Sequence, residues 1–197
     1  MRTVVLATAN AGKQRELAAL LVPYGIELVL QSTLGVQPVE ETGTTFEQNA
    51  LLKARHAAQI TGLAALADDS GLEVDVLDGR PGVYSARYAG PDASDADNNA
   101  RLLAELAGVG DTQRGARYRC VLALLRTPGD AAPLIACGTW EGRIARAPGG
   151  SGGFGYDPLF VPVGRSVTAA QLSATEKNNI SHRGLALRAL LAQLPPP

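Results

Sequence analysis

A short apolar segment that runs into two adjacent acidic residues constrains the fold of this chain most. Residues 63–67 read LAALA, Asp68 and Asp69 follow, and a Ser-Gly pair comes directly after them. This pattern predicts a buried β-strand that delivers carboxylates to a loop at its end. Because sites of α/β proteins lie at such strand ends, we expect the functional site here.

The two aspartates should face opposite sides of the sheet, since successive strand residues point in opposite directions. Only one of them is therefore the candidate for chemistry. Clustered carboxylates repel each other, and proteins usually hold them together to bind a divalent cation or to move a proton. Ligands that are all oxygens favour Mg²⁺. The alternative is that Asp68 and Asp69 cap a turn, because Asp and Ser are ordinary turn residues.

The N-terminal residues predict a strand, a tight loop and a helix, an arrangement that can bind phosphate. Residues 3–7 are apolar, and a helix is expected to open at Asn10 and to end at Pro23 and Gly25. Amides at a helix N-terminus attract anions, and Lys13 adds a positive charge. The loop matches neither standard glycine-rich nucleotide motif. A side-chain cap beside a surface lysine is the alternative interpretation.

A second helix is expected to end near Thr61, after a strand over residues 27–31 and the acidic pair Glu40 and Glu41. One face of this helix carries three polar residues at the i, i+4, i+7 spacing, Asn49, Lys53 and His56. Such a row of donors suits a polyphosphate or the carboxylates that hold a metal. A solvated helix face is the alternative, most of all for His56.

Farther along, a helix is expected within residues 92–106, followed by two strand-length apolar segments over 118–125 and 134–144. Cys120 and Cys137 lie in these two segments without the spacing of metal ligands. Both cysteines are therefore interpreted as small buried hydrophobic side chains.

Residues 148–158, PGGSGGFGYDP, form the most glycine-rich segment of the chain. A flexible linker is the default for such a composition. Phe154, Tyr156 and Asp157 argue against it, because aromatic side chains in a linker have nothing to contact. A ligand base stacking on Phe154 would explain them, and a packed turn is the alternative.

Near the C-terminus, Ser181, His182 and Arg183 precede an apolar segment expected to be helical over residues 185–194. Ser181 is a candidate cap, and with this cap His182 and Arg183 fall in the first turn. Cations in the first turn of a helix are disfavoured by the helix dipole. A bound nucleotide or a nearby carboxylate would supply the compensating anion.

Length and charge exclude several classes of function. The chain has 197 residues and a formal net charge of −1, which favours neither nucleic acid nor an anionic membrane as partner. The first residues lack the pattern of a signal peptide, and no apolar segment approaches the length of a membrane span. We therefore expect a cytoplasmic protein with one domain, divided at most into two lobes.

Five segments together resemble the inosine/xanthosine triphosphate pyrophosphatase family, bacterial branch, in their order and spacing over nearly the whole chain. They are TANAGK at 8–13, EETGTTFEQNALLKA at 40–54, ADDSGLEVDVLDGRPGVYSARYAG at 67–90, GGFGYDPLF at 152–160, and SHR at 181–183 preceded by Lys177. The resemblance implies an α/β fold with an elongated mixed β-sheet flanked by helices. It also implies two lobes within one domain, residues 1–197, with a central substrate cleft.

The same resemblance implies a homodimeric enzyme that uses Mg²⁺ to cut the bond between the α and β phosphates of non-standard purine nucleoside triphosphates. ITP, dITP and XTP would give the nucleoside monophosphate and pyrophosphate, which keeps inosine and xanthosine out of DNA and RNA. A Maf-type nucleotide pyrophosphatase and a non-catalytic nucleotide-binding regulator are the alternatives. The intact acidic pairs argue against the regulator.

By this resemblance, Asp69 is the proton acceptor and a metal ligand, and Glu41 or its neighbour Glu40 is the second metal carboxylate. Ser70 is a substrate contact. The triphosphate is expected to contact Thr8, Ala9, Asn10, Ala11, Gly12 and Lys13, and Lys53 joins this group because of its charge. The base is expected to contact Phe154, Gly155, Tyr156, Asp157, Lys177, His182 and Arg183.

Overall fold

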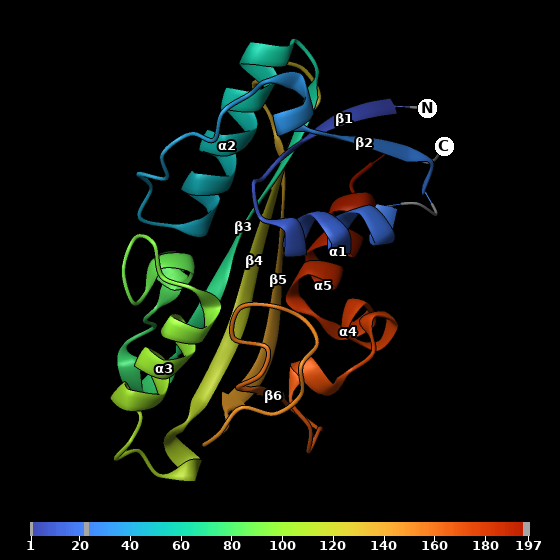
Figure 1. Cartoon of the computed structure of the whole chain (residues 1–197). Helices are drawn as coiled ribbons and strands as arrows, with labels where there is room; N and C mark the ends of the chain where they lie inside the picture. Colours follow the sequence, from blue (N-terminus) through green and yellow to red (C-terminus); the bar gives the residue numbers. More distant parts are fainter. Residues whose placement is uncertain (1, 22–23, 195–197) are drawn as a thin grey trace. The chain divides into compact units, whose positions relative to one another are not determined.

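A computed structural model describes residues 2–21 and 24–194 (Figure 1). These residues form two compact units. Unit 1 takes its described residues from 2–21, 24–69, 120–138 and 183–194, and unit 2 from 70–119 and 139–182. Each unit is thus assembled from segments that are distant in sequence. Pro23, one of the two residues expected to end the first helix, lies outside the described residues.

The strands belong to a six-stranded mixed sheet in the order β2-β1-β3-β4-β5-β6. β1 pairs in parallel with β2 and with β3, whereas β5 and β6 are antiparallel. The predicted α/β class, with a mixed sheet and flanking helices, is confirmed. The strand bounds are β1 Arg2–Ala7, β2 Ile26–Leu30, β3 Ala64–Val74, β4 Gly115–Leu125, β5 Leu134–Ile144 and β6 Phe160–Pro162.

The helices begin and end close to the expected residues, except at the C-terminus. The α-helices are α1 Ala11–Leu21, α2 Phe46–Thr61, α3 Asp95–Glu105, α4 Ala174–Ile180 and α5 His182–Leu191. Short 3-10 helices are η2 Gln31–Leu34, η3 Asp75–Leu77, η4 Gly82–Arg87, η5 Asp111–Gln113 and η6 Ala169–Gln171. α5 follows the candidate cap Ser181 directly, so His182 and Arg183 are its first two residues, and it ends at Leu191 rather than at Leu194. No helix among the described residues combines the length and hydropathy needed to cross a bilayer.

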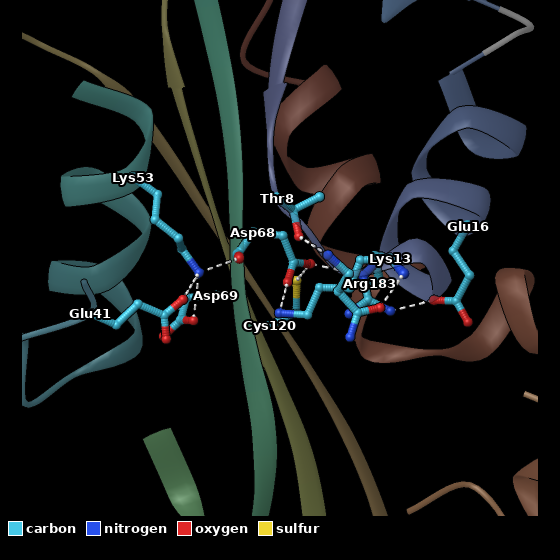
Figure 2. Close-up of polar contacts among 10 residues, drawn as sticks. Thr8, Lys13, Glu16, Glu41, Lys53, Asp68, Asp69, Cys120 and Arg183 are labelled. Carbon is cyan, nitrogen blue, oxygen red and sulfur yellow. Dashed lines mark hydrogen bonds and ion pairs between the residues drawn. The ribbon is translucent and has the colours of Figure 1, made fainter. Parts of the chain in front are cut away.

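The core of unit 1 joins the strands to α1 and α5. Leu17 and Leu21 of α1 pack in one cluster with Leu6, Leu66 and Leu122, and α5 adds three further side chains, Ala186, Leu187 and Leu190. α2 lies on the opposite side of β3 from α1 and α5 (Figure 2). Two faces of the strand are thereby covered, which accounts for its unbroken burial from residue 65 to residue 69.

The core of unit 2 is aromatic. Tyr118 stacks on His182 with ring centroids 4.6 Å apart, and Trp140 and Phe160 pack beside them. Gly142 of β5 faces the ring of Phe160, where an added Cβ would lie 2.5 Å from Cζ. The glycine therefore allows close packing between β5 and Phe160.

Two expectations were wrong. Asp68 and Asp69 are not at a strand end, because β3 continues through Ser70 to Val74. Cys137 is exposed, because the alternation of β5 buries its neighbours Ala136 and Gly138 instead. The glycine-rich segment 148–158 lies wholly within unit 2, which agrees with the argument from its aromatic side chains against a linker. Cys120 is buried, as predicted.

Candidate active site

Asp68 and Asp69 lie in the middle of β3, and their side chains point to opposite faces (Figure 2). Asp69 points toward α2, where it meets Lys53 and Glu41. Asp68 points toward α1 and α5, where it meets Lys13 and Arg183. The prediction that the two carboxylates point to opposite faces is confirmed. They do so from the middle of a strand rather than from a loop at its end.

Lys53 of α2 joins the carboxylates of Asp69 and Glu41. Its Nζ lies 2.8 Å from Asp69 Oδ1, 2.7 Å from Glu41 Oε1 and 2.8 Å from the backbone oxygen of Asp68. An ammonium group has three N–H bonds, so these three oxygens use its whole donor capacity. Of the two roles considered for Lys53, this arrangement favours holding carboxylates over binding phosphate.

The segment that carries Glu41 is fastened to the start of α2. Asn49 is buried, and its Oδ1 accepts the N–H of Gly43 at 2.8 Å. Thr45 caps the helix by accepting the N–H of Gln48 at 3.2 Å. Glu41 is thereby held against Lys53, whereas its neighbour Glu40 is exposed. His56, on the same helix, contacts the backbone oxygen of Gln37 at 2.9 Å.

Asp69 is buried and electrostatically strained. Its side chain is only 6% exposed, and the removal of water raises its pKa above the ordinary value against the opposing charges of Lys53 and Lys13. The nearby carboxylate of Glu41 raises the pKa further. The second oxygen, Oδ2, is buried without a hydrogen-bond partner among the described residues. Such an oxygen is costly unless a ligand or water completes it.

The pair of carboxylates fits a hard divalent cation. Within residues 2–21 and 24–194, no group of three or more His, Cys, Asp and Glu side chains is placed to hold a metal ion. Asp69 and Glu41 therefore offer two ligand groups. Mg²⁺ is commonly bound in this way, through one or two carboxylates together with water and substrate phosphate oxygens.

The loop between β1 and α1 is ordered by its own side chains. Thr8 Oγ1 accepts the N–H of Asn10 at 3.2 Å, and Asn10 Oδ1 accepts the N–H of Lys13 at 3.0 Å. Asn10 is thus the side-chain cap of α1. Ala9 and Ala11 are exposed, and Gly12 is buried. The helix N-terminus is consequently presented with small side chains, which leaves room for an anion to approach its amides.

Lys13 is not a surface lysine, because its side chain is 13% exposed and its Nζ lies 2.6 Å from Asp68 Oδ1. Burial alone would raise the pKa of Asp68, but the charges of Arg183 and Lys13 hold it well below the ordinary value. Cys120 Sγ also donates to Asp68, at 3.2 Å. Asp68 is therefore an ionised buried carboxylate.

Arg183 is buried in the first turn of α5, where the compensating anions are carboxylates of the protein. Its Nε donates to Asp68 Oδ2 at 2.8 Å, and its Nη1 forms an ion pair with Glu16 of α1. These contacts raise the pKa of Arg183 further above its ordinary value despite its burial. Glu16 was not singled out from the sequence, although it follows Lys13 by one helical turn.

In unit 2, the expected base contacts form a second cluster. Asp157 is buried, accepts the N–H of Phe154 at 2.9 Å and forms an ion pair with Lys177. Lys177 Nζ lies 4.9 Å from the ring centroid of Phe154, a cation–π distance. Two of the residues expected to contact the base, Phe154 and Lys177, thus lie next to each other.

The other expected base contacts in unit 2 are parts of its framework. Tyr156 is buried, and its hydroxyl donates to the backbone oxygen of Ser85 at 2.8 Å. The N–H of Gly155 donates to Asp95 at 2.6 Å. Ser70 follows Asp69 in β3 and is partly buried. For Tyr156, these contacts favour the packed-turn interpretation of the glycine-rich segment.

Comparison with known proteins agrees with this geometry. Residues 4–193 match the Ham1 family. A dITP/XTP pyrophosphatase from Escherichia coli O157:H7 is 58% identical over 194 residues, 98% of each chain. The structure of a HAM1 protein from Coxiella burnetii matches with a TM-score of 0.89 and 49% identity, covering 98% of each chain. A nucleoside-triphosphatase / dITP/XTP pyrophosphatase from Mycobacterium abscessus ATCC 19977 / DSM 44196 matches with a TM-score of 0.76 and 47% identity, covering 98% of this chain and all of that one. Because both sequence and fold match over nearly their whole length, this chain belongs to the Ham1 family.

Proposed function

We propose that this protein hydrolyses the non-standard purine nucleoside triphosphates dITP, XTP and ITP to the nucleoside monophosphate and pyrophosphate. The relatives named dITP/XTP pyrophosphatase, which share more than half of their residues with this chain, support the substrate class. Removal of these nucleotides keeps inosine and xanthosine out of DNA and RNA. A cytoplasmic location and a homodimeric assembly remain predictions.

The observation that carries the proposal is the buried Asp69 carboxylate with one oxygen held by Lys53 and the other without a partner among the described residues. Lys53 fixes the orientation of Asp69, and the raised pKa makes this carboxylate a stronger base than an exposed aspartate. In this proposal, Asp69 Oδ2 orients a water molecule and accepts its proton.

Asp69 and Glu41 would hold Mg²⁺, which when bound neutralises phosphate charge and lowers the pKa of water. Lys13 and the amides at the N-terminus of α1 bind the phosphate oxygens, and they oppose the negative charge that keeps a nucleophile from phosphorus. Lys53 holds the carboxylates of Asp69 and Glu41 close to each other. After cleavage, pyrophosphate dissociates from Lys13 and from the amides of α1 that bound the triphosphate.

Recognition of the base is proposed for Phe154 and Lys177 of unit 2, and the resemblance adds His182 and Arg183. Phe154 offers a stacking surface, and Lys177, His182 or Arg183 supplies a donor to the 6-keto oxygen of hypoxanthine or xanthine. In adenine, the 6-amino group would place a hydrogen-bond donor against the donor of the protein. A buried polar group would then be left unpaired. Adenine nucleotides are thereby rejected.

The test is turnover of ITP, dITP, XTP, ATP, dTTP and UTP, with and without Mg²⁺, by the wild type and Asp69→Asn. We expect turnover of the first three only with metal, and a loss of about 10²- to 10⁴-fold in kcat in the variant, because its amide cannot accept a proton. Asp92→Asn, at an exposed position, is the control.

A preference for dTTP and UTP would favour a Maf-type enzyme. Absence of pyrophosphate release from every nucleotide would favour a non-catalytic regulator. Near-wild-type kcat in Asp69→Asn would remove Asp69 from the mechanism while leaving the substrate class intact.

A further inference from the structure

Four charged residues on the Asp68 face of β3 form a chain of alternating sign. Lys13 Nζ contacts Asp68 Oδ1 at 2.6 Å, Asp68 Oδ2 accepts from Arg183 Nε at 2.8 Å, and Arg183 Nη1 pairs with Glu16 (Figure 2). Lys13 and Glu16 belong to α1, Asp68 to β3 and Arg183 to α5. This series of contacts therefore connects Lys13, the proposed phosphate-binding residue, to Glu16, which has no role in the proposed mechanism.

Burial makes these four positions depend on one another. The side chains of Asp68 and Arg183 are 0% and 1% exposed, and those of Lys13 and Glu16 are each 13% exposed. A buried charge without a partner is strongly destabilising, so each group stays where its neighbours neutralise it. The charges of the two cations and the two carboxylates sum to zero. A change in one of these charges therefore alters the electrostatic environment of the neighbouring group.

The guanidinium of Arg183 lies between two carboxylates and directs one nitrogen to each. The pull of Glu16 on Nη1 opposes the pull of Asp68 on Nε. Without the negative charge of Glu16, the positive charge of the guanidinium is balanced by Asp68 alone. A more strongly neutralised Asp68 attracts Lys13 less, and the Nζ position that binds phosphate is then no longer fixed.

We propose that Glu16 is a positioning residue for triphosphate binding that acts on Lys13 through Arg183 and Asp68. This inference rests on the proposed function, in which Lys13 contacts phosphate. The thiol of Cys120 holds Asp68 Oδ2 from a separate strand. Asp68 thus stays in place when Glu16 changes, so the change is transmitted as charge rather than as a collapse of the site.

The first measurement is steady-state kinetics of Glu16→Gln, which keeps the size of the side chain and removes its charge. We expect KM for dITP and the inhibition constant of pyrophosphate to rise about fivefold, with kcat within about twofold of wild type. Arg15→Gln, the exposed neighbour of Glu16 on α1, should change neither. A residue with only a structural role would lower the active fraction, and hence kcat, rather than KM.

The second measurement is a double-mutant cycle with Lys13→Met. If Glu16 acts through Lys13, Glu16→Gln has no further effect on kcat/KM in the Lys13→Met background. Equal effects of Glu16→Gln in both backgrounds, or an unchanged KM in the single variant, would overturn the inference. Wild-type enzyme without activity on dITP would refute the proposed function instead, so the two failures are distinct.

Thermal unfolding establishes that each variant is folded before its kinetics are compared. If Glu16→Gln does not fold, the cycle is run with Glu16→Asp, which keeps the charge and withdraws it by one methylene group. A rise in KM that disappears without Lys13 supports the inference, and an unchanged KM overturns it.

Discussion

The acidic pair shows how one residue step along a strand separates two electrostatic environments. Asp68 is held ionised by two cations, and the pKa of its carboxyl is well below the ordinary value. Asp69 shares a single lysine with Glu41, and desolvation raises its pKa. Asp69 has fewer cations in contact with it than Asp68. It is therefore the carboxylate suited to bind a metal cation and to accept a proton.

At the residue scale, Glu41→Gln should weaken metal binding and Glu40→Gln should not. Glu41 lies 2.7 Å from Lys53 beside Asp69, whereas Glu40 is exposed. Loss of one of two carboxylate ligands should raise the Mg²⁺ concentration for half-maximal activity by at least about tenfold. Titration of activity with MgCl₂ measures this, with Glu40→Gln as the matched control. The reverse result would assign the metal to Glu40.

At the element scale, β3 and α2 act as a pair of rigid supports. β3 directs Asp68 and Asp69 to opposite faces, and α2 places Lys53 within hydrogen-bond distance of Asp69. The hydrogen bond from Gly43 to Asn49 ties the acidic segment to the same helix. A site built on a strand and a helix is positioned more precisely than one on loops.

Strand β5 gives a prediction on packing in unit 2. A Cβ at Gly142 would lie 2.5 Å from both Phe160 Cζ and Val161 O, so Gly142→Ala should destabilise the protein by about 1–3 kcal/mol. An added Cβ at Gly108 meets nothing within 4 Å, which makes Gly108→Ala the control. Urea unfolding of both variants measures the difference. Equal stability of the two would show that β5 and β6 move apart at little cost.

At the scale of the whole molecule, each unit is closed by segments far apart along the chain. α5 begins after residue 181, yet it supplies Ala186, Leu187 and Leu190 to the core built by β1, β3 and α1. It also supplies Arg183 to Asp68. Both the core and the charge network of unit 1 therefore depend on the last helix.

Leu187→Ala should cost about 2–5 kcal/mol of unfolding free energy, because the side chain is 1% exposed and its loss leaves a cavity. Leu185→Ala, two residues earlier in the same helix, removes a side chain that is 38% exposed and should have a small effect. Chemical denaturation followed by circular dichroism compares them. Similar losses for both variants would contradict the position of α5 in this core.

The sequence by itself determined the α/β class and most of the strands and helices in their order, whereas β6 and α4 were not predicted. Periodicity and capping are local, so α2 and α3 are predicted close to their observed bounds. Family resemblance depends on motifs in order, and from it Asp69, Lys13 and Phe154 are predicted as site residues without any coordinates.

Only the tertiary structure decided which groups meet. It placed the acidic pair within β3 rather than at its end, brought Glu41 rather than Glu40 to Lys53, and paired Arg183 with Asp68 and Glu16. It also exposed Cys137. These outcomes depend on contacts between segments up to 167 residues apart, and the energy of such contacts is set by burial and by charge balance, which no local pattern contains.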